Sequence, residues 1–467
     1  MESSLLPALV FAALLLPAGL LGDRFGRKWL LVAGLAIFGL ASLAGAFADG
    51  TGGVIAARAF MGLGAAIAMP LSMSMIPAIF PPEERTRAVA IWSASTALGL
   101  PLGPLLGGWL LENFWWGSIF LINVPVVVVG GLAIALLLPE TRDPAAPRVD
   151  GVGALLSMGG LVALVFGVIE APVHGWGAPP VVGAFVLAAV LITGFAYWEG
   201  RVRDPMIDLR LLRDARFGWA LVAAVAANVV MGGALFVLPQ FLEAVQGNDA
   251  FGTGLRLVPL LLGLMAGGLA TDRVAPRTGH KPLIVAGLGV LAAGLGWGAL
   301  TGAGTGYAAV WPWLTVTGLG LGLALIPAMD ALLSALPPDQ AGRGSGLVQT
   351  LRQTGATLGV AGLGSLLSAV YRDEVRADGL PPEAADAARD SVGGGAVAAA
   401  DRLGDPALLA SARDAYASGM DVVLLACAAG ALGTAVLLWR FLPGGTAAPG
   451  AAPGGDAAES THEHVAS

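Results

Sequence analysis

The sequence predicts an all-α polytopic membrane protein, and three observations support this fold class. Only 12% of the 467 residues are charged and 56% are hydrophobic, whereas a soluble domain carries about 25% charged residues. Apolar runs of about 20 residues, long enough to cross a bilayer, recur along the whole chain. The basic residues fall in alternate loops between these runs. A chain with a mean hydropathy of +0.78 has more apolar surface than water can solvate, so we expect the lipid bilayer to be its main partner.

The length criterion predicts about thirteen spans. They cover residues 5–22, 29–48, 52–80, 86–111, 117–138, 151–170, 179–198, 217–242, 254–272, 281–302, 308–335, 344–371 and 419–442. A polar loop at 372–418 separates the last two, and the Pro- and Gly-rich residues 443–467 are expected to form a disordered tail. We divide the rest into an N-terminal helix bundle (1–138), two linker helices with a connector (139–216) and a C-terminal helix bundle (217–442).

The basic residues predict the orientation of the spans. One set of alternate loops, together with the end of the last span, holds Arg24, Arg27, Lys28, Arg85, Arg87, Arg142, Arg148, Arg201, Arg203, Arg210, Arg213, Arg216, Arg273, Arg277, Lys281, Arg343 and Arg440. The other short loops carry none. The positive-inside rule therefore places the basic loops and the carboxyl terminus in the cytoplasm.

The stretch "GLLGDRFGRKW" concentrates charge between the first two spans. Arg27 and Lys28 alone would be ordinary positive-inside charges, but Asp23 opposes that rule and the glycines allow a tight reversal. A carboxylate at a helix end can face the N-terminus of another helix, so we expect Asp23 to dock on the helix that starts near Gly344. The stretch contains Gly19, Gly22, Asp23, Arg24, Gly26, Arg27 and Lys28.

Several stretches in series resemble one family. "GLLGDRFGRK" resembles the cytoplasmic loop signature of the major facilitator superfamily, and "RAFMGLGAA" is similar to its fourth-helix motif. "GLPLGPLLGG" is similar to the fifth-helix motif of proton-coupled antiporters and supplies Gly99, Gly103, Pro104, Gly107 and Gly108. "IFLINVP", "PAMDALLSALPPDQAGRGSG" and "TLRQTGATLGVAGLGSLLSAVY" narrow the resemblance to the fourteen-span drug:proton antiporter branch, the multidrug and quaternary-ammonium exporters.

This resemblance implies two helix bundles with two extra central helices, in a bacterial plasma (inner) membrane. It also implies transport driven by the proton gradient, without a cofactor. Three departures are visible: the family's first helix has no counterpart, Met61 replaces an expected glutamine, and Gly117 replaces an expected arginine. A start codon placed too late and a truncated form both remain open as explanations for the missing helix.

The glycines of the antiporter motif suggest a close helix contact. Gly99, Gly103 and Gly107 share a helical face, which lets a neighbouring backbone approach. This face serves either tight packing or, as the resemblance implies, rocking of the two halves. In the family's arrangement the matching small face would be that of Gly263 and Gly267.

Asp330 and Arg352 are ionisable residues inside predicted spans, which makes them functional candidates. At about 1.5 Å per residue both lie roughly 10 Å inside the cytoplasmic end, where they could pair. A static ion pair is one interpretation. The other is that a buried Asp330, following the helix-bending Pro327, exchanges protons. The resemblance implies coupling or cation recognition at this position, so Asp330 is our first choice as proton carrier.

Five further polar residues are candidates. Arg58 resembles the fourth-helix arginine implicated in proton transfer, with snorkelling or packing as the alternative. Glu243 and Arg256 flank a predicted external loop and could form a gate pair or a solvated pair. Gln349 and Gln353 are candidates for lining the path. Met69, Met73, Met75, Trp92, Trp311 and Trp313 either line an adaptable apolar pocket or pack in the core and against lipid.

The sequence shows no pattern for a zinc site, a P-loop or a catalytic triad, and its single cysteine lies in an apolar run. We therefore expect no enzyme, no metal and no nucleic-acid partner. The main interpretation is a monomeric secondary exporter that exchanges protons for hydrophobic or cationic small molecules. The alternatives are a lipid or natural-product exporter, and an inactive truncated membrane protein with a scaffold role.

Overall fold

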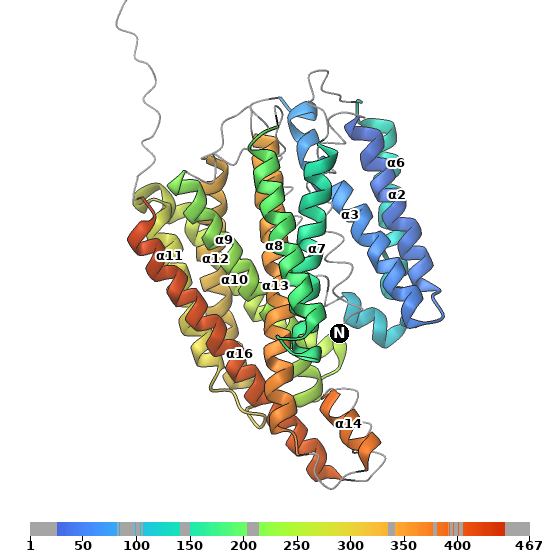
Figure 1. Ribbon diagram of the computed structural model, residues 1–467, viewed down its shortest axis with the longest axis vertical. Helices are drawn as coiled ribbons and strands as arrows, with labels where there is room; N and C mark the ends of the chain where they lie inside the picture. The colour runs from blue at the N-terminus through green and yellow to red at the C-terminus, as the bar shows by residue number, and fades with distance from the viewer. Residues whose placement is uncertain are drawn as a thin grey trace, which may run out of the picture.

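The computed structural model describes residues 26–81, 84, 99, 103, 106–140, 150–202, 214–334, 341–376, 381–390, 392, 396, 400 and 405–443. Its labelled elements are all helices (Figure 1). They are α2 (Arg27–Ala46), α3 (Thr51–Ile79), α5 (Ser118–Leu121), α6 (Asn123–Leu137), α7 (Gly151–His174), α8 (Pro179–Glu199), α9 (Ala215–Gln240), the π-helix η2 (Phe241–Val245), α10 (Ala250–Thr278), α11 (His280–Gly298), α12 (Tyr307–Ser334), α13 (Ala341–Glu374), α14 (Pro382–Asp390) and α16 (Pro406–Phe441).

Eleven helical segments of the described chain are long and apolar enough to cross a membrane. They match eleven of the thirteen predicted spans. The predicted span 5–22 lies outside the described residues, and so does most of the span 86–111. The all-α polytopic fold class is confirmed.

Aspartates start four of the long helices. Each carboxylate accepts hydrogen bonds from backbone N–H groups of the first turn, which have no partner inside the helix. These residues are Asp150 before α7, Asp214 before α9, Asp249 before α10 and Asp405 before α16. The negative charge also complements the positive end of the helix dipole.

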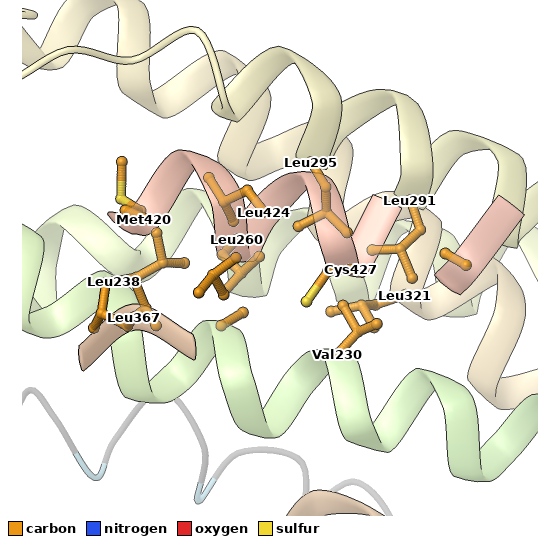
Figure 2. Packing of buried hydrophobic residues seen from close by; sticks show 14 of the residues in the cluster. Val230, Leu238, Leu260, Leu291, Leu295, Leu321, Leu367, Met420, Leu424 and Cys427 are labelled. Atoms are coloured by element: carbon orange, nitrogen blue, oxygen red, sulfur yellow. The ribbon is translucent and has the colours of Figure 1, made fainter. Parts of the chain in front are cut away.

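The main core lies among α9, α10, α11, α12, α13 and α16 (Figure 2). Its labelled side chains are Val230, Leu238, Leu260, Leu291, Leu295, Leu321, Leu367, Met420, Leu424 and Cys427. Glycines bring several of these helices into backbone contact: a Cβ at Gly318 would overlap the Leu260 carbonyl, and one at Gly359 would overlap that of Val229. Small residues at such contacts are typical of membrane helix packing, where close backbone approach replaces the hydrophobic driving force.

A second group of helices lies apart in Figure 1, where α2, α3 and α6 stand together at one side. Leu31, Leu71 and Met75 form its buried cluster. The α7–α8 hairpin lies between this group and the main core in the view, and Val165 and Ile169 of α7 pack against Ala361 of α13. The predicted domain boundaries remain a prediction.

The predicted loop 372–418 is shorter than expected and partly helical. The preceding helix α13 continues to Glu374, α16 already begins at Pro406, and α14 lies between them. Asp405 caps α16, and Pro406 is suited to the first helical position because its fixed φ matches the helix. An apolar-length criterion misses these helical turns because they are polar.

Candidate functional site

A polar contact joins the two groups of helices at α13. Arg352 Nη1 donates a hydrogen bond to Gln349 Oε1 at 3.2 Å, and Gln349 Nε2 lies 3.8 Å from Met69 Sδ of α3, as a donor to sulfur. Three predicted candidates are thus brought together from residues 280 positions apart in the chain. Gln353, one turn further along α13, is partly buried.

Asp330 lies near the end of α12, three residues after Pro327, and its side chain is exposed. Burial was expected, so this conformation differs from the prediction. Among the described residues no ion pair joins Asp330 to Arg352, whose guanidinium is turned to Gln349 instead. The two charged groups share the predicted end of the membrane, but the structure does not pair them with one another.

Arg58 lies on α3 with its side chain exposed, and its guanidinium carbon is 5.6 Å from the ring centroid of Phe120. Cation–π contacts of this kind contribute about 0.5–1 kcal/mol at exposed sites. The geometry fits the packing alternative, and the proton-transfer role remains a prediction.

The Glu243–Arg256 gate pair, one of the two alternatives for these residues, is not formed in this conformation, and a gating role remains a prediction. Glu243 is exposed on η2, and in the part of the chain that the structure describes it forms no ion pair with Arg256. Arg256 instead lies 5.3 Å from the ring centroid of Tyr307, whose hydroxyl donates to the Arg256 carbonyl at 3.1 Å. The sequence shows that Glu243 and Arg256 flank the same loop. It cannot show that the guanidinium of Arg256 packs on the ring of Tyr307.

The opening motif is described only from Gly26 onward, so Gly19, Gly22, Asp23 and Arg24 lie outside the described residues, as does the expected docking of Asp23. Gly26 has φ 110°, a conformation that favours glycine. Lys28 N–H, in the first turn of α2, donates to Glu140 Oε1 at 3.3 Å. Sequence reasoning missed Glu140, which places a carboxylate at the start of α2, where the helix dipole favours it.

The antiporter motif makes its close contact at Gly108. A Cβ there would lie 2.6 Å from the Phe251 backbone at the start of α10. A Cβ at Gly99, Gly103 or Gly107 would meet no described atom within 4 Å, and Pro104 lies outside the described residues.

The predicted partner face on α10 is therefore corrected. Gly263 and Gly267 are packed against the backbone of α12 near Thr315 and Leu319, and not against those residues of the antiporter motif that the structure describes. The motif does reach α10, but at its first turn. A sequence can show that two helices each have a face lined by glycines, but not which of several neighbouring helices each face contacts.

A carboxyl pair lies one helical turn beyond Gly108, and sequence reasoning did not connect its members. A hydrogen bond joins the side chains of Glu112 and Asp249, while Asp249 Oδ1 also accepts from Gly252 N–H at 2.6 Å. Desolvation, followed by the negative charge of Asp249, raises the pKa of Glu112. We call this contact, with Gly108 and Phe251, the carboxyl seam.

The methionines and tryptophans of the proposed apolar pocket divide between two roles. Met75 and Trp313 are fully buried core residues, and Trp313 packs on Gly298. Trp311 is exposed, and Met69 lies beside a polar candidate, Gln349. Trp92 and the side chain of Met73 lie outside the described residues. Within the described residues no group of three or more His, Cys, Asp or Glu could hold a metal ion.

A polytopic helical bundle with ionisable residues inside its spans has the architecture of a membrane transporter. The chain matches the Major Facilitator Superfamily over residues 3–360 and belongs to that family.

Curated relatives are similar over most of their length. The "Multidrug efflux pump LfrA" of Mycolicibacterium smegmatis is 34% identical over 88% of this chain and 82% of its own. The "Tetracenomycin C resistance and export protein" of Streptomyces glaucescens is 31% identical, over 85% and 75%. The "Methyl viologen resistance protein SmvA" of Salmonella typhimurium is 31% identical, over 93% and 89%.

Solved structures show the same fold. A bacterial homologue of the human lysosomal transporter Spinster, inward-facing and occupied, has a TM-score of 0.63 at 17% identity, covering 94% of this chain and 89% of that one. The human organic anion transporter MFSD10 has a TM-score of 0.57 at 16% identity, with 92% and 82% covered. The family and these neighbours are transporters, which points away from catalysis.

Proposed function

We propose that this protein is a secondary active transporter that exports drugs and other hydrophobic or cationic small molecules in exchange for protons. The observation that carries the proposal is similarity, across most of both chains, to proteins named for drug efflux and resistance. Export of a natural product is a second candidate, because one of these relatives is named for exporting tetracenomycin C.

The orientation follows from the basic residues. Lys28, Lys281 and Arg440 lie at the ends of α2, α11 and α16, and Lys281 Nζ donates to the carbonyl of Leu442. The positive-inside rule assigns this end to the cytoplasm and with it the carboxyl terminus. We further propose that the protein acts as a monomer in the bacterial plasma membrane.

Asp330 is our proposed proton carrier. Its exposed carboxyl on α12 is accessible to protons in this conformation. Protonation would lower its affinity for a cation, while cation binding would favour release of the proton. Each elementary charge that crosses 100 mV supplies about 2.3 kcal/mol, enough to drive accumulation of cargo against a gradient.

Ethidium efflux from a pump-deficient bacterium tests this proposal. Efflux is expected to stop on addition of a protonophore and to fall at least about tenfold in Asp330→Asn, because an amide cannot carry the proton. Asp386→Asn makes the same change at an exposed residue of α14 and should leave efflux intact. Efflux that survives the protonophore contradicts proton coupling, and full activity in Asp330→Asn contradicts the carrier assignment.

A further inference from the structure

Arg352 is a cation in the interior, and among the described residues no acidic side chain pairs with it. Its Nε is buried and has no hydrogen-bond partner in the described part of the protein. Its one hydrogen bond there goes to Gln349, a neutral amide. Placing an unpaired charge away from water costs several kcal/mol, so a group that is retained in this state needs a partner at some point of its working cycle.

The packing of α13 shows that Arg352 does not face lipid. Gly355 and Gly359 follow Arg352 on the same helical face, and both lie against α9, at Val225 and Val229. Gln349, one turn earlier, reaches Met69 on α3. The guanidinium is therefore held between α9 and the contact that joins the two groups of helices, where cargo would pass between them.

The unused Nε–H donor of Arg352 determines which kind of ligand would bind there. A guanidinium offers N–H groups in a planar fork, which match the two oxygens of a carboxylate, and it offers no acceptor. Gln349 takes up Nη1, so that Nε–H remains for an oxygen of a ligand. A purely cationic cargo would leave this donor unsatisfied.

We propose that Arg352, oriented by Gln349, binds an acidic oxygen of the cargo, so that the transporter accepts aromatic compounds carrying a carboxylate or an ionised hydroxyl in addition to cations. This inference rests on the proposed export function.

A matched pair of dyes isolates the acidic oxygen. Rhodamine 6G is a cationic aromatic ester, and its hydrolysed free acid has the same ring system with a carboxylate. Purified protein in liposomes with an imposed pH gradient should transport both dyes. In Arg352→Gln, transport of the acid should fall about tenfold, while that of the ester stays within about twofold. Arg440→Gln removes the same charge from an exposed position and should change neither.

Gln349→Glu tests the same site while keeping Arg352. The new carboxylate would pair with the guanidinium and occupy the donor, so acid transport should fall while ester transport is retained or increased. This variant balances the buried charge, and a monodisperse elution profile in detergent confirms that it is folded.

Four other results would overturn the inference. Equal loss of both dyes in Arg352→Gln, or unchanged acid transport in both variants, overturns the inference. Transport of the ester but not of the acid by the parent protein also overturns it and leaves the export function standing. Transport of neither dye by the parent contradicts the export function and the inference together.

Discussion

Single glycines determine how closely the helices of the main core approach. Gly318 on α12 is in contact with the backbone of α10, where a Cβ would overlap the Leu260 carbonyl. Gly289 on α11 has open space around its Cβ position. The two positions have the same residue type in similar apolar helices, but only one of them is required by packing.

Gly318→Ala is expected to destabilise the protein by about 1–3 kcal/mol, because the methyl group forces α10 and α12 apart. Gly289→Ala should be neutral or stabilising by up to about 1 kcal/mol, because alanine has the higher helix propensity. Thermal unfolding of the two purified variants in detergent checks both. Equal melting temperatures would show that the α10–α12 contact tolerates the methyl group.

For single residues, the sequence predicts which ones are unusual but not which side chains they contact. Asp330 and Arg352 stand out because ionisable residues in apolar spans are rare. Their pairing could not be predicted, because it depends on side-chain directions, and Gln349 is nearer to Arg352 along the same helix face. Glu112 and Asp249 escaped notice because ordinary loop carboxylates carry no local signal of a contact.

Whole helices are predicted well in number and less well in extent. Apolar length identifies each described span because the bilayer imposes it. It does not identify α14 or the first turns of α16, whose polar sequence lies outside any such constraint. The starts of helices are more visible, because an aspartate before an apolar run supplies the missing hydrogen bonds.

Asp150 provides a test of such a start. Its Oδ1 accepts from Val152 and Gly153 N–H, and its Oδ2 accepts from Trp198 Nε1 at 2.8 Å, which ties α7 to α8. Asp150→Ala should destabilise this end of the hairpin by about 0.5–2 kcal/mol. Amide hydrogen exchange over residues 151–157 is expected to accelerate in the variant.

Asp150→Asn separates the two contacts, since its side-chain oxygen can still cap α7 while its NH2 group cannot accept from Trp198 Nε1. Exchange over residues 151–157 should therefore stay closer to that of the parent than in Asp150→Ala. Exchange in Asp150→Ala that equals the parent's would mean that packing alone orders the first turn of α7.

Across the whole molecule, the carboxyl seam connects residues 106–113 to the start of α10. The seam stabilises the protonated form of Glu112, because its pKa is raised there. The stabilisation that the carboxyl seam gives to the contact between residues 106–113 and α10 is therefore complete below the ordinary pKa of a glutamate. It is lost as the pH rises through the raised pKa of Glu112. Above that value two carboxylates would face each other.

Spin labels at Asn113→Cys and Gly302→Cys, both exposed at this end of the molecule, report the separation of the two helix groups. The fraction of molecules with a short distance between the two spin labels should fall as the pH rises through the raised pKa of Glu112. With Glu112→Gln in addition, an amide that needs no proton should keep this fraction constant. An unchanged pH response in that variant would assign the effect to another group.

The length of α16 has a practical consequence for imaging. At about 1.5 Å per residue its 36 residues span about 54 Å, against about 30 Å of hydrocarbon. The apolar part ends at Phe441, so the excess projects at the opposite end, beside α14, which Tyr371 holds through a 2.8 Å hydrogen bond to the Ala388 carbonyl. A transporter buried in a micelle offers few landmarks for particle alignment, and this helical projection is a built-in one, to which an antibody fragment could be raised.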